Sequence, residues 1–431
     1  MRKLILGLVL IGCISCQQST NSNHELAKVV AQDTLLTEVK EMARETVKRG
    51  FSAGDGYREV WIRDFNTFIS LATELQSKDL IKENLRIFFH LQDSSGSIVD
   101  GFIPREQAKQ TPGGYQYIFS SSEPRYAGHK NTVETDQESA LVQAVSKYIR
   151  QSSDRAFLEE EIAGIRVAAR LELAMDYLLA HRYHSSYGLL WGATTADWGD
   201  VQPEHHWGVY LDAHSHLAID IYDNAMFLIA LDHLIEMLPE RKSKWAPIRE
   251  DIARQAMTHL WDDRAKKFVP HIYLDESPFP PDFQESEVYY HGGTAVAIEA
   301  GLLSKEQVSN ALERMRTNVE NADAHTIGLT LYPTYPSGSF KNPAMHPYGY
   351  QNGGDWDWFG GRMILQLIHY GYVNEAYREL RPMLERAVDN QGFYEWYDAD
   401  NQPRGSGEFR GSAGVLYDAI IALEEELGLP L

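Results

Sequence analysis

The sequence is poor in cysteine, which excludes a disulfide framework. Its 431 residues include two cysteines, Cys13 and Cys16, both close to the N-terminus. No cysteine follows residue 16, so no disulfide can cross-link the rest of the chain. Stability must therefore come from the burial of apolar surface, and the chain is long enough to form one large core or two ordinary ones.

Basic residues and phosphate-binding patterns are also scarce. Lys and Arg number 40 against 61 Asp and Glu, and the formal net charge is −21. Because nucleic acid binding requires a basic surface that displaces counterions, we expect no nucleic acid partner. No glycine-rich phosphate loop follows a strand, and no serine or cysteine triad pattern stands out.

Four histidines, His205, His206, His214 and His216, stand close together in one expected loop. Their spacing differs from that of a helical zinc site, and no cysteine is available as a further ligand. A hydrogen-bonding role beside Trp207 is the simpler interpretation. We therefore expect neither a metal ion nor a cofactor.

The first residues have the pattern of a signal peptide. Met1-Arg2-Lys3 carries positive charge, and the apolar stretch at 4–12 is too short to span a bilayer. Both 10–13 and 13–16 resemble a bacterial lipobox, so either Cys13 or Cys16 would be lipidated. The alternative is an ordinary cleaved signal peptide with incidental cysteines.

This pattern predicts three segments along the chain. They are a lipoprotein signal peptide at 1–16, a short tether at 17–25 and one folded domain at 26–431. The lipid would hold the secreted domain on the periplasmic or outer surface of a bacterial membrane, and this anchor would be the protein's sole membrane contact.

Apolar residues recur at helical spacing through most of the chain, whereas alternating strand patterns are almost absent. This favours an all-α fold with about twelve helices. The helical windows are 26–47, 65–75, 80–91, 139–148, 157–179, 225–238, 248–260, 295–300, 305–315, 359–369, 373–388 and 413–427.

Every second predicted helix is preceded by a loop rich in Gly, Trp, Asp and Tyr. If the helices pair into hairpins around a ring, the inner helices all direct their N-termini to one side, and these loops converge on one cavity. We therefore predict an (α/α)6 barrel of six helical hairpins; a helical solenoid with variable loops is the alternative. The six helix starts are 61–64, 135–138, 222–224, 291–294, 355–358 and 407–410.

Three of the loop clusters place carboxyl groups beside tryptophan, at 58–64, 197–200 and 395–398, with Glu408 close behind. Hydrolysis of an acetal needs a protonated carboxyl on the leaving oxygen and a second carboxylate that activates water or attacks the anomeric carbon. An adjacent apolar ring raises the pKa of a carboxyl by desolvation, as a general acid requires. The nine Trp and 23 Tyr also suit a sugar-binding pocket, since flat rings pack against the C–H faces of sugars.

These segments resemble, in the same order, the motifs of six-hairpin glycosidases: glucoamylases of family 15, the amylo-α-1,6-glucosidase domains of glycogen debranching enzymes, and family 63 glucosidases. The segment 57–64 is similar to their Trp-x-Arg-Asp segment, 197–200 to the segment with the general acid, and 222–225 to an Asn-containing helix start. The segment 350–358 resembles their Gln-Gly-x-x-Trp-x-Trp segment, and 395–405 the stretch around the general base.

The resemblance implies roles for individual residues. Asp200 would be the general acid and Glu395 the general base, with Asp197 and Glu408 as the alternatives. Arg63 and Asp64 would bind hydroxyls of the terminal sugar. Further expected substrate-binding residues are Arg58, Trp61, Asp136, Trp198, Asn224, Gln351, Trp356, Trp358 and Arg404. A donor such as Arg404 or a backbone amide would keep the base ionised.

The sequence therefore predicts a lipid-anchored, exo-acting and inverting glycoside hydrolase that removes a terminal, α-glucoside-like sugar from an oligosaccharide or polysaccharide. No obligate protein partner is evident. One alternative is another sugar-active enzyme on the same ring of helices, such as a lyase, an epimerase or a uronide hydrolase. The other is a glycan-binding lipoprotein without catalytic activity.

Overall fold

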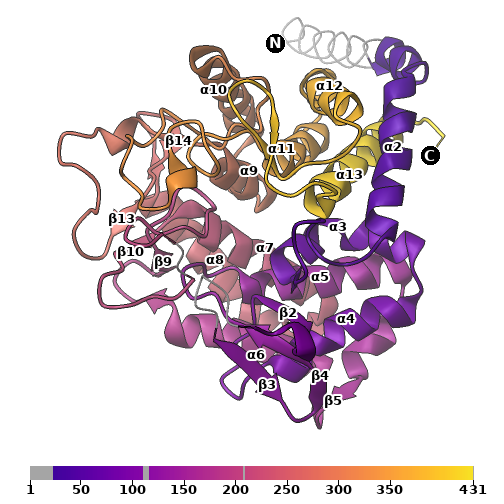
Figure 1. Ribbon diagram of the computed structural model, residues 1–431, viewed down its shortest axis with the longest axis vertical. Coiled ribbons are helices and arrows are strands. Elements are labelled where there is room, and N and C mark those ends of the chain that lie inside the picture. Colours follow the sequence, from indigo (N-terminus) through magenta and orange to yellow (C-terminus); the bar gives the residue numbers. More distant parts are fainter. Residues whose placement is uncertain (1–22, 110–115, 207–208, 431) are drawn as a thin grey trace, which may run out of the picture.

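Two concentric layers of helices build the fold (Figure 1). The computed structural model describes residues 23–109, 116–206 and 209–430, so the predicted signal peptide and both cysteines lie outside the described residues. In the described part of the chain, no helix is both long and apolar enough to cross a membrane.

Six helices form a closed inner ring. Each packs against the next, and the last packs against the first, because α13 contacts both α11 and α3. These inner helices are α3 (Ile62–Leu75), α5 (Gln137–Ser152), α7 (Ile221–Met237), α9 (His291–Glu299), α11 (Asp357–His369) and α13 (Arg410–Glu426).

An outer helix precedes each inner helix in the sequence, which makes six hairpins and confirms the predicted (α/α)6 barrel. The first and last hairpins meet where α2 packs against α12 and α13. The outer helices are α2 (Thr34–Lys48), α4 (Lys78–Leu91), α6 (Val167–His181), α8 (Lys242–His259), α10 (Lys305–Ala322) and α12 (Val373–Asp389).

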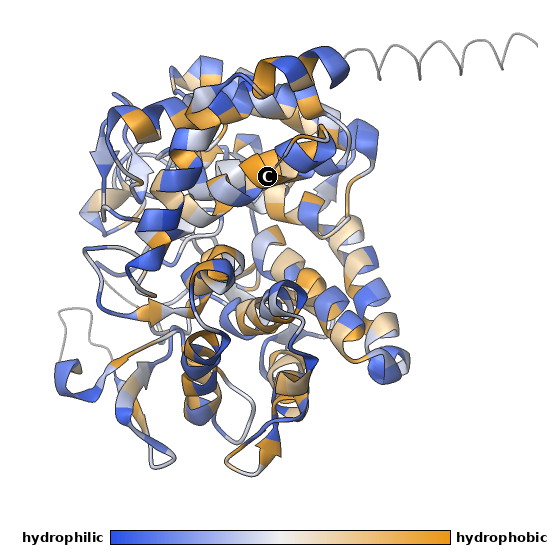
Figure 2. Cartoon of the chain, turned by 90° about the vertical axis from the view of Figure 1, so that its right-hand side faces the viewer, coloured by the Kyte–Doolittle hydropathy of each residue, from blue (hydrophilic) through white to orange (hydrophobic). Residues whose placement is uncertain are grey.

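Burial distinguishes the two layers. The inner helix α5 buries 13 of its 16 residues, whereas the outer helix α8 buries three of 18. Hydrophilic and hydrophobic residues accordingly alternate in bands along the helices in Figure 2, as expected where one face packs inward and the other meets water. The main hydrophobic core is continuous from Leu26 to Leu423.

The six predicted helix starts coincide with the N-termini of the six inner helices. Since the inner helices share one direction around the ring, these N-termini lie on one side of the barrel. Two predicted windows were wrong in detail. The window 26–47 is interrupted by Asp33, which caps α2, and the window 157–179 contains the hairpin of β5 (Glu161–Ile162) and β6 (Ile165–Arg166) before α6 begins.

The near absence of strands was also an incorrect expectation for the segment before α5. An antiparallel four-stranded sheet in the order β1-β2-β4-β3 lies there. Its strands are β1 (Val60–Trp61), β2 (Gly101–Pro104), β3 (Tyr117–Ser120) and β4 (Glu123–His129). A smaller sheet joins β9 (Gly192–Ala193), β10 (Leu217–Ile219) and β13 (Ile272–Tyr273). Other strands, such as β16 (Trp396–Tyr397) and β17 (Pro403–Arg404), form two-residue ladders in the loops.

Candidate active site

A small cavity of about 50 Å³ lies where the inner helices begin. Tryptophans from two loops form much of its wall. The rings of Trp198 and Trp356 meet edge to face at 4.7 Å, and Trp198 stacks on Phe359 at 4.3 Å. The residues that line the cavity are Tyr57, Trp61, Arg63, Asp64, Trp198, Asp200, Tyr350, Gln351, Trp356, Trp358, Glu395 and Phe409.

Glu395, directly before β16, holds one of the carboxyl groups in this cavity. Its Oε2 accepts a hydrogen bond from the Tyr57 hydroxyl at 2.8 Å and another from the Ser406 backbone N–H at 2.9 Å. Burial raises the pKa of Glu395 to about 7, and the two donors partly oppose this effect because they stabilise the ionised form. Of the two donors expected for this carboxylate, Arg404 or a backbone amide, the amide is present as the Ser406 N–H, whereas the Arg404 guanidinium pairs with Asp398 at 2.5 Å.

Two loops fix the surroundings of Glu395. The Ser406 hydroxyl accepts from the Gly56 N–H at 2.9 Å and lies 3.1 Å from Asp55 Oδ1, which ties the Tyr57 segment to the Ser406 loop. Gly405 adopts a φ of +69°, and a Cβ added there would lie 2.3 Å from Glu395 Oε2. A side chain at position 405 would therefore displace the carboxylate.

Asp200 supplies a second carboxyl group from the loop between β9 and β10. Its Oδ1 accepts from Gln351 Nε2 at 2.8 Å, and its charge is one of those that raise the pKa of Glu395. The two carboxyl groups thus come from loops almost 200 residues apart in the sequence and face one cavity.

Asp197 anchors the loop that carries Asp200. Its two carboxylate oxygens accept from the Gly292 and Gly293 N–H groups, each at 2.7 Å, at the N-terminus of α9. A Cβ at Gly292 would lie 2.2 Å from the Trp198 ring, so this contact requires glycine. The anchored carboxylate is not among the groups that line the cavity.

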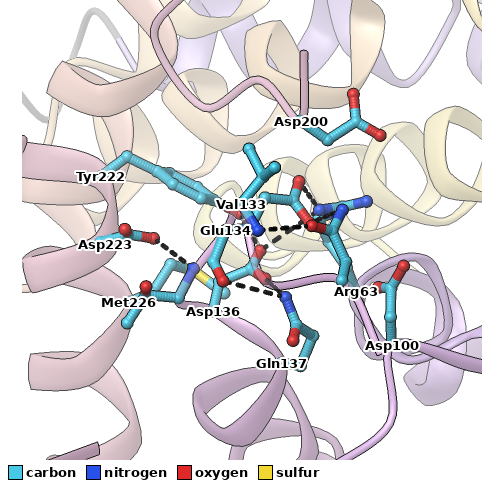
Figure 3. A network of polar contacts seen from close by, with 12 residues as sticks. Arg63, Asp100, Val133, Glu134, Asp136, Gln137, Asp200, Tyr222, Asp223 and Met226 are labelled. Carbon is cyan, nitrogen blue, oxygen red and sulfur yellow. Dashed lines mark hydrogen bonds and ion pairs between the residues drawn. The ribbon is translucent and has the colours of Figure 1, made fainter. Parts of the chain in front are cut away.

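Arg63 and Asp64 lie in the first turn of α3 and line the cavity. Arg63 forms ion pairs with Glu134 and, at 3.7 Å, with Asp136, which also accepts from the Tyr222 hydroxyl at 2.8 Å (Figure 3). Burial raises the pKa of Asp64 to about 7, while the adjacent Arg63 lowers it. Asp136 therefore pairs with Arg63 behind the cavity wall and does not line the cavity.

Several other predicted site residues do not line the cavity. The side chain of Asn224 bonds to the backbone of Leu190 and Asp220, and Arg58 is exposed. Glu408 pairs with Arg49 and faces a separate surface cavity of about 590 Å³. In contrast, Trp61, Trp198, Gln351, Trp356 and Trp358 do lie together around the cavity, as expected.

The sequence reasoning missed Tyr57, Tyr350 and Phe409, which also line the cavity. Tyr57 and Tyr350 are the first residues of the segments 57–64 and 350–358, which resemble glycosidase motifs, and this position was the sequence feature that could have identified them. Phe409 is the residue before α13, at one of the six predicted helix starts.

The helix start at α11 is held by ion pairs. Arg386 of α12 donates to Asp355 Oδ1 at 2.7 Å and to Asp357 Oδ1 at 2.5 Å, and all three residues are buried. These carboxylates thus have a structural role at the helix N-terminus and position Trp356 between them. Across residues 23–109, 116–206 and 209–430, no cluster of three or more His, Cys, Asp or Glu side chains could hold a metal ion.

Neither protein-family profiles nor curated protein sequences match the chain. Solved structures match its fold. A GH63 mannosylglycerate hydrolase from Thermus thermophilus, in complex with glucose, aligns over 88% of this chain and 99% of its own with 18% identity and a TM-score of 0.63. A rhamnosidase from Klebsiella oxytoca with rhamnose bound aligns over 90% of this chain and 63% of its own, with 14% identity and a TM-score of 0.58. The structural overlap, at sequence identities this low, shows a shared (α/α)6 fold.

Proposed function

We propose that this protein is a glycoside hydrolase in which Asp200 is the general acid and Glu395 the general base. The observation that carries the proposal is the pair of carboxyl groups from two distant loops in one aromatic-walled cavity. Acetal hydrolysis requires this combination of an acid, a base and exclusion of bulk water. The two similar folds described above belong to glycoside hydrolases, which agrees with the proposal.

In the proposed reaction Asp200 gives its proton to the glycosidic oxygen while the bond from that oxygen to the anomeric carbon breaks. Glu395 removes a proton from water as the water oxygen bonds to the anomeric carbon, which inverts the configuration. Tyr57 and the Ser406 N–H hold Glu395 Oε2, so the other carboxylate oxygen is the one that faces the water. Because its pKa is about 7, Glu395 is ionised mainly above neutral pH.

A terminal, uncharged sugar is the substrate that suits this cavity. The cavity is small, about 50 Å³, which supports exo-action on the end of an oligosaccharide or polysaccharide. Among the described lining residues Arg63 is the one cation, and Glu134 and Asp136 already neutralise it. A uronic acid would find no free cation there, so a neutral sugar fits better than a uronide. The resemblance to family 63 and family 15 enzymes supports an α-glucoside-like sugar.

Carboxamide variants of the two acids test this proposal. Wild type is screened on aryl glycosides and natural oligosaccharides, and the best substrate is used for the variants. Loss of an acid or base lowers kcat by about 10²- to 10⁴-fold, so Glu395→Gln should be nearly inactive and Asp200→Asn should retain more activity on substrates with good leaving groups. Glu408→Gln, whose carboxyl faces another cavity, should remain active. Tight glycan binding without turnover by wild type would contradict the proposal and favour a capture protein.

We further propose that the mature protein is secreted and lipid-anchored. The support is the sequence pattern at 1–16, because both Cys13 and Cys16 stand in lipobox-like segments.

A further inference from the structure

Asp100 is a buried carboxylic acid that the proposed reaction does not use. It directly precedes β2, and it is 4% exposed. Its backbone is fully engaged: its N–H donates to His129 and its carbonyl accepts from Ile62. Its carboxyl oxygen Oδ1, in contrast, is buried without a hydrogen-bond partner among the described residues. Buried polar atoms are rarely left in this state unless a ligand or a water completes them.

No ion pair explains the burial of Asp100. Figure 3 shows the Asp100 carboxyl on one side of Arg63, while Glu134 and Asp136 lie on the other side and form the ion pairs with it. His129 Nδ1 lies 4.0 Å from Asp100 Oδ2, but burial lowers the pKa of His129 to about 4, so this imidazole is neutral at pH 7. Lys130 is bonded to Glu138 and to the Ile98 carbonyl.

A complementary donor lies beside Asp100. The next residue, Gly101, pairs with Trp61 in the register of β1 and β2, and a Cβ added to Gly101 would lie 3.0 Å from Trp61 Nε1. That indole N–H is also buried without a partner among the described residues, and Trp61 lines the cavity. Asp100 itself lies behind the lining residues, but it is close enough to Asp200, which lines the cavity, for that charge to raise its pKa. An unpaired donor in the cavity wall and an unpaired acceptor behind the wall thus lie near the same cavity.

We propose that Asp100 and the Trp61 indole N–H form a hydroxyl-binding subsite that selects among terminal sugars. A sugar hydroxyl can accept from an indole N–H and donate to a carboxylate at the same time, which completes both orphaned groups. A site that binds a hydroxyl in this way rejects the analogue without it, because the buried polar groups are then left unpaired. The inference rests on the proposed glycosidase function and makes Asp100 a specificity-determining residue of the pocket.

The burial of Asp100 should also make the stability of the folded protein depend on pH. Desolvation raises the pKa of Asp100 to about 7, so the folded state holds its proton more tightly than the unfolded chain does. The stability that this protonation provides is present at low pH and is lost as the pH rises through about 7. At pH 8 the ionised Asp100 therefore destabilises the free protein, as expected of a group kept for binding.

The test compares the activities of wild type and Asp100→Asn on a set of substrates. Wild type and variant are assayed with the aryl glycoside that wild type cleaves best and with each of its monodeoxy derivatives. The variant should lose about tenfold in kcat/KM on the parent glycoside, which corresponds to one weakened hydrogen bond to a charged group. On the one derivative that lacks the bound hydroxyl, variant and wild type should be equal. An equal loss on every substrate would overturn the subsite.

Thermal melting at pH 8 gives a readout that needs no substrate. Asp100→Asn should raise Tm, because it removes a buried charge whose desolvation outweighs the attraction of Arg63, and a lower or unchanged Tm would overturn the inference. The matched control is Asp93→Asn in the same loop, whose carboxyl accepts from the Ser95 and Ser97 N–H groups in a turn. This control should not raise Tm and should affect all substrates equally. A wild type that cleaves no glycoside would instead contradict the proposed function itself.

Discussion

Glu395 is subject to two opposing effects, and their balance sets the pH at which the proposed reaction runs. Burial favours its protonated form, whereas the Tyr57 hydroxyl and the Ser406 N–H favour its ionised form. A general base works best when its pKa lies near the working pH, because it is then both ionised and basic. The surroundings of Glu395 place it in this range.

Removal of one donor should shift this balance. Tyr57→Phe deletes the hydrogen bond to Glu395 Oε2, so the ionised base is less stable and its pKa rises further above its ordinary value. The acidic limb of the kcat/KM profile should move to higher pH by about one unit, as expected for a bond worth about 1.4 kcal/mol. A pH-rate series on the best substrate measures this. An unmoved limb, or one moved to lower pH, would show that another group controls activity.

The sequence predicted that Asp200 and Glu395 share one site, and both line the cavity, but it did not predict the atoms that support them. Trp198 and Asp200 are adjacent in one motif, and the motif predicts that they share a site. Whether Arg404 or Tyr57 reaches Glu395 depends on how two loops cross, and no local pattern encodes that crossing. Asn224 was also predicted to bind substrate, but its side chain forms hydrogen bonds with the backbone of Leu190 and does not line the cavity.

The N-terminus of α9 shows how a helix holds the loop that carries Asp200. Asp197 accepts two backbone N–H groups there, which satisfies donors that a helix start leaves free. Burial raises the pKa of Asp197 well above its ordinary value, and these two hydrogen bonds oppose that effect. Asp200 follows three residues later, so this anchor determines where its carboxyl lies. From sequence alone Asp197 was a rival for the acid role, because its chemistry is identical and the capping partner is almost 100 residues away.

Gly292→Ala should disrupt this anchor. The added methyl group would meet the Trp198 ring and Asp197 Oδ2, at 2.2 and 2.9 Å, so the loop must move away from α9. A displacement of about 1 Å at a reacting group can cost about 100-fold, and we expect a kcat loss of that order. Gly392→Ala is the control, since its Cβ would meet only Tyr394, at 4.0 Å, and it should keep wild-type activity. Full activity of Gly292→Ala would show that the anchor does not position Asp200.

The closed ring explains why the loops rich in Gly, Trp, Asp and Tyr share one side of the molecule. The sequence predicted this arrangement because loops rich in Gly, Trp, Asp and Tyr alternate with short connections along the chain. The contact of α13 with α3 closes the ring and confirms the prediction. The sheet before α5 escaped prediction because its strands are short and none alternates cleanly between apolar and polar residues. Its stability comes from pairing with distant segments, as between β2 and β4.

The proposed membrane anchor is a property of the entire protein and can be tested without any substrate. Wild type expressed with its own N-terminus should partition into the detergent phase, and a Cys13→Ser, Cys16→Ser double variant should remain in the aqueous phase. The two single variants show which cysteine is lipidated. Wild type in the aqueous phase would indicate an ordinary cleaved signal peptide.

The stereochemistry of the reaction tests the central claim most directly. If Asp200 and Glu395 act as acid and base with a water between them, their carboxyl groups are about 6.5 to 9.5 Å apart and hydrolysis inverts the anomeric centre. An NMR time course of wild-type hydrolysis, begun on a glycoside of known configuration, follows the anomer that forms before mutarotation. The first product should have the opposite configuration to the substrate. A first product of retained configuration would mean a covalent intermediate, and the assignment of Glu395 as a base would be wrong.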